Sequence, residues 1–143
     1  MLDRSLPAAD ERRVAPPGRP QPRWPLAFLG VAGVMGAAGV AVGAAGAHVG
    51  GGDLARTASE FLLVHAAALL GAAGAALRVG TLPLAIAMAL LALGAALFGG
   101  ELATAALWDW RPVPLAAPAG GLCLIAGWLF LVPSAIAVAL GRR

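Results

Sequence analysis

The polar and apolar positions divide the chain into four long apolar blocks separated by short polar breaks. From Trp24 to Val49 no side chain is charged, and comparable blocks follow at about 58–77, 82–108 and 118–140. A helix rises about 1.5 Å per residue, so each block is long enough to cross a hydrocarbon core about 30 Å thick. The pattern predicts helices over about 25–49, 58–78, 82–108 and 118–140.

Composition agrees with a membrane location. The chain is 60% hydrophobic and only 12% charged, and its mean hydropathy is +0.85, which is not typical of a soluble domain. Four apolar helices joined by short loops predict an all-α integral membrane protein, an up-down bundle of four transmembrane helices within residues 24–143. Lysine is absent and the arginines gather at the two ends, so the lipid bilayer is the expected partner and nucleic acid is not.

The first 23 residues have a different character. They contain five prolines and five arginines and show no apolar periodicity, which predicts a disordered cytoplasmic tail. The small residues Ala45-Gly46-Ala47 also resemble a signal-peptidase site. The apolar region of a signal peptide is usually about 7 to 15 residues long, and this one is much longer. A retained first helix is therefore favoured over a cleaved one.

The arginines also predict an orientation. Eight lie in the tail, the second loop and the C-terminus, whereas only Arg56 and Arg111 lie in the first and third loops. Cytoplasmic loops carry the positive excess, so both termini should face the cytoplasm. Trp24 then lies at the inner interface, Trp108 and Trp110 lie at the outer one, and Trp128 lies near the midplane.

Four ionisable residues are expected at the outer side of the membrane: His48, Glu60, His65 and Glu101. Such groups are costly within apolar segments, so they mark either a functional site or a structural contact. Glu60 lies about 140° around the helix from His65, a poor position for pairing. Glu101 is therefore the expected partner of His65, while Arg56 lies one turn from Glu60 and within reach of it.

The chain offers few groups for catalysis. No glycine-rich loop carries the lysine of a nucleotide-binding P-loop, and the serines, histidines and acids form no recognisable catalytic order. Three ligands remain open as alternatives: zinc bound by His48, His65 and an acid, haem held between the two histidines, and a quinone. The favoured reading assigns the histidines structural roles, so no catalytic residue, metal site or cofactor is predicted.

Small residues recur at helical spacing and predict tight packing between helices. Gly39 and Gly43 lie four residues apart, and Gly71 repeats with alanines at the same spacing. Gly120, Gly121 and Gly127 are the packing positions expected in the last helix. Such residues can form a dimer interface, but packing within the chain is the favoured interpretation. Pro133 in the last helix breaks its hydrogen bonding, for which Ser134 is expected to compensate.

Several separated motifs resemble one family. They are Gly43-Ala44-Ala45-Gly46-Ala47-His48, Glu60-Phe61-x-x-x-His65, Leu97-Phe98-Gly99-Gly100, and Pro118-Ala119-Gly120-Gly121 followed by Gly127-Trp128. Over about residues 26–140 the chain resembles the YgdD-like family of small four-helix membrane proteins, known as domain of unknown function 423. The resemblance implies a multi-pass protein of the bacterial inner membrane with mitochondrial relatives, and it implies no particular reaction.

The resemblance also ranks the four ionisable residues. His48, Glu60 and His65 match the family pattern, whereas Glu101 stands where the family typically has serine. The resemblance therefore keeps the first three as the core of the site and treats Glu101 as a local variation.

Two functions remain open at the level of sequence. The first is a structural or accessory membrane component that forms a homo-oligomer or joins a larger complex through its glycine-rich faces. The alternative is a transport or redox element that uses the outer cluster of histidines and acids.

Overall fold

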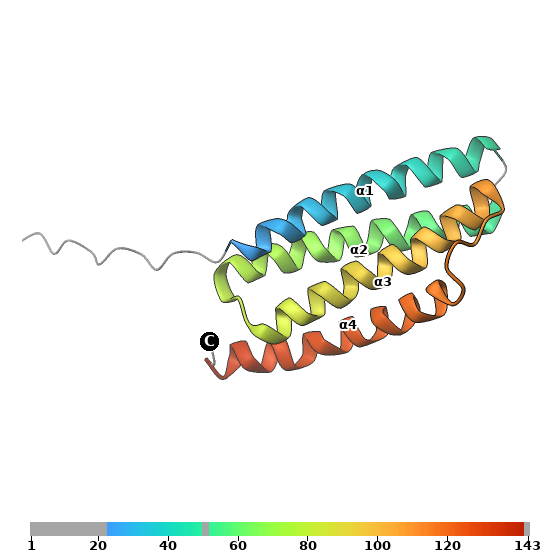
Figure 1. Cartoon of the computed structure of the whole chain (residues 1–143). Coiled ribbons are helices and arrows are strands. Elements are labelled where there is room, and N and C mark those ends of the chain that lie inside the picture. Colours follow the sequence, from blue (N-terminus) through green and yellow to red (C-terminus); the bar gives the residue numbers. More distant parts are fainter. Residues whose placement is uncertain (1–22, 50–51, 142–143) are drawn as a thin grey trace, which may run out of the picture.

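Four long helices make up the part of the chain that the structure, a computed structural model, describes: residues 23–49 and 52–141. The helices are α1 (Trp24–Val49), α2 (Gly52–Val79), α3 (Leu82–Trp108) and α4 (Ala116–Ala139). Each is long and apolar enough to cross a membrane. Successive helices run in opposite directions (Figure 1), so the predicted all-α up-down arrangement is confirmed. The tail predicted at 1–23 lies outside the described residues except for Arg23.

The start of α2 differs from its prediction. The helix begins at Gly52 rather than near residue 58, and its first turns carry charged side chains. Arg56 pairs with Asp53 at 3.1 Å and with Glu60 at 3.3 Å. These spacings of three and four residues place all three side chains on one helical face. A hydropathy pattern detects only the part of a helix that lies in hydrocarbon. It therefore did not detect the polar first turns of α2, residues 52–57.

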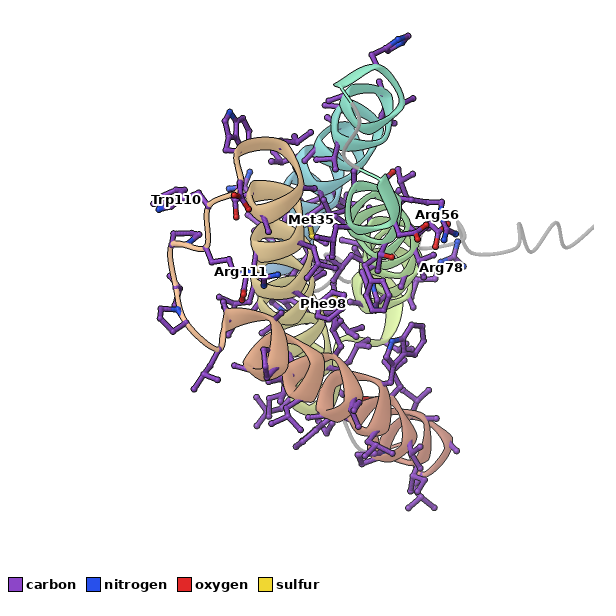
Figure 2. The ribbon with its side chains drawn as sticks, turned by 90° about the vertical axis from the view of Figure 1, so that its right-hand side faces the viewer. Met35, Arg56, Arg78, Phe98, Trp110 and Arg111 are labelled. Carbon is purple, nitrogen blue, oxygen red and sulfur yellow. The ribbon has the colours of Figure 1, made fainter. Side chains whose placement is uncertain are left out.

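The helices do not close into a square. α2 packs against α1 and α3, α4 packs mainly against α3, and α1 makes a smaller contact with α3. Figures 1 and 2 place α1 and α4 on opposite sides of the α2–α3 pair. The largest fully buried side chains of this pair are Leu69, Met88 and Leu91. The outer surfaces of α1 and α4 expose many large apolar side chains, as lipid-facing helices do.

Glycines set the closest approaches between helices. At the α3–α4 contact, a Cβ at Gly120 would lie 2.6 Å from the backbone nitrogen of Phe98 and 2.8 Å from the carbonyl oxygen of Gly94. At the α1–α2 contact, a Cβ at Gly39 would lie 2.8 Å from Leu63 Cγ, and one at Gly43 would lie 2.8 Å from Ser59 Oγ. Small residues permit this backbone proximity.

The predicted packing glycines therefore divide into two groups. Gly39, Gly43, Gly120 and Gly127 pack within the chain, the last of them against Leu91. Gly71 and Gly121 were also predicted to pack, but a Cβ at either would meet nothing within 4 Å. That prediction is wrong for contacts within the chain, because these two residues lie on outward faces of their helices.

Adjacent glycines in α4 provide a test of the α3–α4 contact. Gly120→Ala should destabilise the protein by about 1–3 kcal/mol, because the added methyl group overpacks a contact made by backbone atoms. Gly121→Ala should leave stability unchanged or raise it slightly, because alanine favours helix and the site is open. Thermal unfolding in one detergent measures both variants. Equal effects of the two substitutions would contradict the contact.

Candidate functional site

The four ionisable residues lie toward one end of the helices. His48 is in the last turn of α1, Glu60 and His65 are in the first half of α2, and Glu101 is near the end of α3. Along α2, Glu60 lies about 27 Å from Arg78, and along α3, Glu101 lies about 28 Å from Leu82. These spans approach the hydrocarbon thickness of about 30 Å. Glu60 and Glu101 therefore mark the same boundary.

The four residues do not form one cluster. Among the described residues, no hydrogen bond or ion pair joins any two of them. His48 is exposed, and Glu60 pairs with Arg56. Glu60 and His65 share the lining of a shallow pocket of about 190 Å³. The predicted pairing of His65 with Glu101 is wrong, because each has other partners.

His65 joins α2 to α4. The residue is only 5% exposed, its Nδ1 lies 2.7 Å from the carbonyl oxygen of Phe61, and its Nε2 lies 3.2 Å from Trp128 Nε1. A carbonyl only accepts a hydrogen bond and an indole N–H only donates one. Both contacts are satisfied when Nδ1 carries the proton and Nε2 accepts from Trp128. The partners thus assign one tautomer to the ring.

Aromatic rings extend the α2–α4 contact at His65 to α3. The centroid of Phe61 lies 4.4 Å from that of Phe98 and 5.8 Å from that of His65. The ring of Trp128 follows at 6.0 Å from His65 in an edge-to-face arrangement. Four rings from three helices therefore form a continuous row, which adds packing energy to the hydrogen bond between α2 and α4.

Glu101 secures the beginning of α4. Its carboxylate is buried and accepts a hydrogen bond at 3.0 Å from Nη1 of Arg111. The other carboxylate oxygen accepts from the backbone N–H of Ala117 in the first turn of α4. The N-cap residue, Leu115, makes no capping bond with its side chain. Glu101 supplies the missing acceptor from α3, and its negative charge suits the positive end of the α4 dipole.

The segment between α3 and α4 needs this support. It begins at Asp109 and ends at Leu115, both of which have positive φ angles, 49° and 69°. A bulky residue in this conformation is strained and persists when its surroundings hold it. Figure 2 shows Arg111 turned from this segment toward the helices. Glu101 is therefore an organising contact, whereas the family resemblance treats it as a local variation.

Several polar contacts were not predicted from the sequence. The hydroxyl of Ser59 donates to the carbonyl oxygen of Gly39 at 2.7 Å, in the buried α1–α2 contact. Trp128 was expected near the midplane but not as a partner of His65, and Arg111 was not linked to Glu101. The one available signal was Arg111, the only basic residue in its loop and ten positions after a buried acid.

The predicted compensation at Pro133 is wrong. Ser134 donates to the carbonyl oxygen of Phe130 at 2.7 Å, four residues before it. A proline at position 133 leaves the carbonyl of Leu129 without its usual helical donor. The serine hydroxyl therefore bonds a different carbonyl from the one that Pro133 affects.

The fold and these contacts define a class: a four-helix integral membrane protein in which Ser59, His65 and Glu101 form hydrogen bonds between helices. Within the described residues, no group of three or more His, Cys, Asp or Glu side chains is placed to hold a metal ion. Residues 42–121 match the family described as "Protein of unknown function (DUF423)", and the chain belongs to this family. The matched segment contains His48, Glu60, His65 and Glu101 but not Trp128. Comparisons with curated proteins and with solved structures gave no match.

The capping role of Glu101 can be tested by hydrogen exchange. Glu101→Ala should speed exchange of the Ala117 amide and destabilise the protein by about 1–3 kcal/mol, because a buried hydrogen-bonded charge is lost and Arg111 loses its partner. Asp109→Asn is a matched control, since Asp109 is exposed and asparagine tolerates its positive φ. Unchanged exchange at Ala117 in Glu101→Ala would contradict the capping role.

Proposed function

We propose that this protein is a structural or accessory component of the bacterial inner membrane, a helical scaffold that associates with a second copy or with larger membrane proteins. One observation carries the proposal. Among the described residues, every buried side-chain nitrogen or oxygen has a hydrogen-bond partner. In hydrocarbon, polar groups paired between helices stabilise the bundle. This is the arrangement expected of a scaffold.

The alternative, a transport or redox element, makes different demands on the same residues. It needs His48, His65 and an acid to converge on one pathway or ligand. Instead, both nitrogens of His65 already have partners, and the Glu101 carboxylate is occupied by Arg111 and Ala117. A ligand or a transferred proton would have to displace a contact between helices. The geometry therefore favours the scaffold.

Open small-residue positions supply surfaces for association. Gly71 and Gly74 on α2 and Gly121 on α4 are among the helical glycines that have no neighbouring atom within 4 Å of where a Cβ would lie. At such positions the backbone of another helix can approach closely. The glycines of the α1–α2 and α3–α4 contacts are already occupied within the chain, so association is assigned to these outward positions.

The proposed orientation places both termini in the cytoplasm. The described chain begins and ends at the same end of the bundle (Figure 1), as an even number of crossings requires, and the arginine distribution selects the side. A phosphatase reporter that is active only in the periplasm should be inactive when fused after Arg143, while a cytoplasm-active fluorescent fusion should be bright. The reverse pattern would contradict this orientation.

Site-specific photo-crosslinking in native membranes tests the association. A crosslinker at position 71 or 121 should give a defined product with a second copy or one membrane protein, whereas a crosslinker at position 34, exposed on α1, should give lipid adducts. The product should persist in His65→Gln, since that residue does not form the outward surface.

Reconstitution of the protein into proteoliposomes tests the transport alternative. Proton flux through the reconstituted protein that is lost in His65→Gln, with helicity unchanged by circular dichroism, would contradict the scaffold and support the transport alternative. Crosslinks at 71 and 121 to lipid alone would also contradict the proposal.

A further inference from the structure

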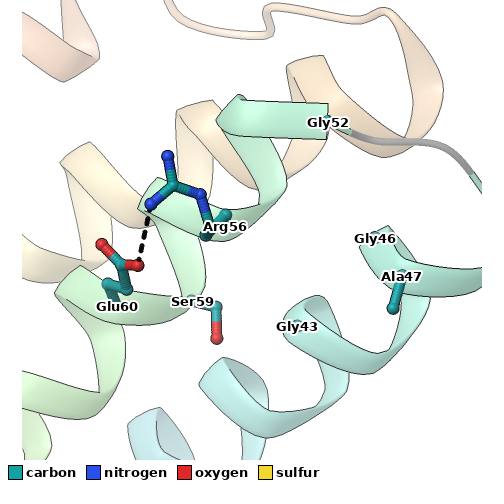
Figure 3. A pocket seen from close by; sticks show the side chains of 7 residues that line it. All are labelled: Gly43, Gly46, Ala47, Gly52, Arg56, Ser59 and Glu60. Carbon is teal, nitrogen blue, oxygen red and sulfur yellow. Dashed lines mark hydrogen bonds and ion pairs between the residues drawn. The ribbon is translucent and has the colours of Figure 1, made fainter.

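A pocket lies between the end of α1 and the beginning of α2 (Figure 3). Its volume is about 450 Å³, and its lining residues are Gly43, Gly46, Ala47, Gly52, Arg56, Ser59 and Glu60. The α1 wall consists of glycine and alanine only, whereas α2 supplies every charged group. Arg56 and Glu60 pair with each other along α2, both are exposed, and among the described residues neither forms a hydrogen bond or ion pair with another helix. Their arrangement is therefore not explained by the packing of the bundle.

The depth of the pocket restricts what can occupy it. Glu60 lies about 27 Å along α2 from Arg78, so it stands close to the hydrocarbon boundary. Arg56 lies about 6 Å farther out, one turn nearer the helix end. A pocket bounded by these two residues is level with the head groups of the surrounding lipids, which are present there at very high local concentration.

The charged groups at the pocket have both hydrogen-bond donors and hydrogen-bond acceptors that remain free for a ligand. Nη1 of Arg56 bonds Glu60 at 3.3 Å and Nη2 bonds Asp53 at 3.1 Å. A guanidinium has five N–H donors, so donors remain for another acceptor, and each carboxylate keeps free acceptor positions. The Arg56 side chain is 65% exposed. One cation between two anions suits a ligand that carries both a phosphate and an ammonium group.

We propose that this pocket binds the phosphoethanolamine head group of a bilayer lipid. Arg56 donates to the phosphodiester, and Glu60, the acid that lines the pocket, accepts from the primary ammonium. Asp53 is not a lining residue, but it pairs with Arg56 and adds negative charge beside the ammonium. A phosphocholine head group has no N–H to donate to the carboxylates, and a phosphoglycerol head group has no cation to pair with them. The proposal concerns a separate surface from the contacts of His65 and Glu101, and it stands whether or not the scaffold function does.

Native mass spectrometry of the full-length protein in detergent tests the proposal. The protein is titrated with phosphatidylethanolamine, phosphatidylcholine and phosphatidylglycerol that carry identical acyl chains. Phosphatidylethanolamine should bind most tightly. Arg56→Gln and Glu60→Gln should each weaken its binding about threefold to fivefold, the effect expected of one exposed charged contact. Arg56→Lys, which keeps the positive charge, should retain more binding than Arg56→Gln.

Two variants serve as controls for charge and location. Arg78→Gln removes an exposed arginine from the opposite end of α2, and Asp109→Asn removes an exposed acid from the same end of the bundle as the pocket. Both should leave binding of phosphatidylethanolamine unchanged. Because Arg56 and Glu60 are exposed, their variants should retain the helicity of the unmodified protein in circular dichroism.

The proposal is overturned by equal affinity for the three lipids, by a preference for phosphatidylglycerol, or by undiminished binding in both Arg56→Gln and Glu60→Gln. Free phosphoethanolamine distinguishes the source of the head group. It should displace the lipid only at far higher concentration, because it lacks the acyl chains. Displacement at equal concentration would show that a soluble ligand, and not a lipid, is the occupant.

Discussion

Hydrocarbon offers no hydrogen-bonding partner, and this constraint explains how His65 is used. A buried polar group without a partner is costly, and His65 avoids that cost with a bond from each ring nitrogen. One bond closes within α2 at Phe61, and the other reaches Trp128 on α4. Satisfying one side chain therefore also joins two helices, and α4 packs elsewhere mainly on α3.

Two further contacts hold α4 at other points. At the hydrocarbon boundary, Glu101 caps the first turn of α4 and holds Arg111, so the strained segment from Asp109 to Leu115 keeps its course. Between them, Gly94 and Gly120 bring the backbones of α3 and α4 together. The same logic applies at the α1–α2 contact, where Ser59 donates to the carbonyl of Gly39. In both contacts, glycines let the two helix backbones approach closely, and a polar side chain adds a hydrogen bond between the helices.

The sequence predicted the helices well because each must be long and apolar enough to cross a bilayer. It predicted the start of α2 poorly, since Asp53 and Arg56 lie in a polar extension of that helix beyond the hydrocarbon and carry no apolar signal. It placed the candidate residues at one end of the bundle and correctly put Arg56 within reach of Glu60, but its pairing of His65 with Glu101 was wrong. The partner of His65 is 63 positions away, and which faces meet depends on how each helix is rotated in the packed bundle. Gly120 and Gly121 show the same limit, because neighbouring glycines in sequence face opposite environments.

His65 is therefore a structural link between α2 and α4 whose two ring nitrogens have fixed roles. Nitrogen-15 NMR of the imidazole and of the Trp128 indole in a lipid environment measures this directly. The link between α2 and α4 requires a proton on Nδ1, an unprotonated Nε2, and a hydrogen-bonded indole N–H at Trp128. A proton on Nε2 would contradict it, because Trp128 would then face a second donor and the link between α2 and α4 would not exist.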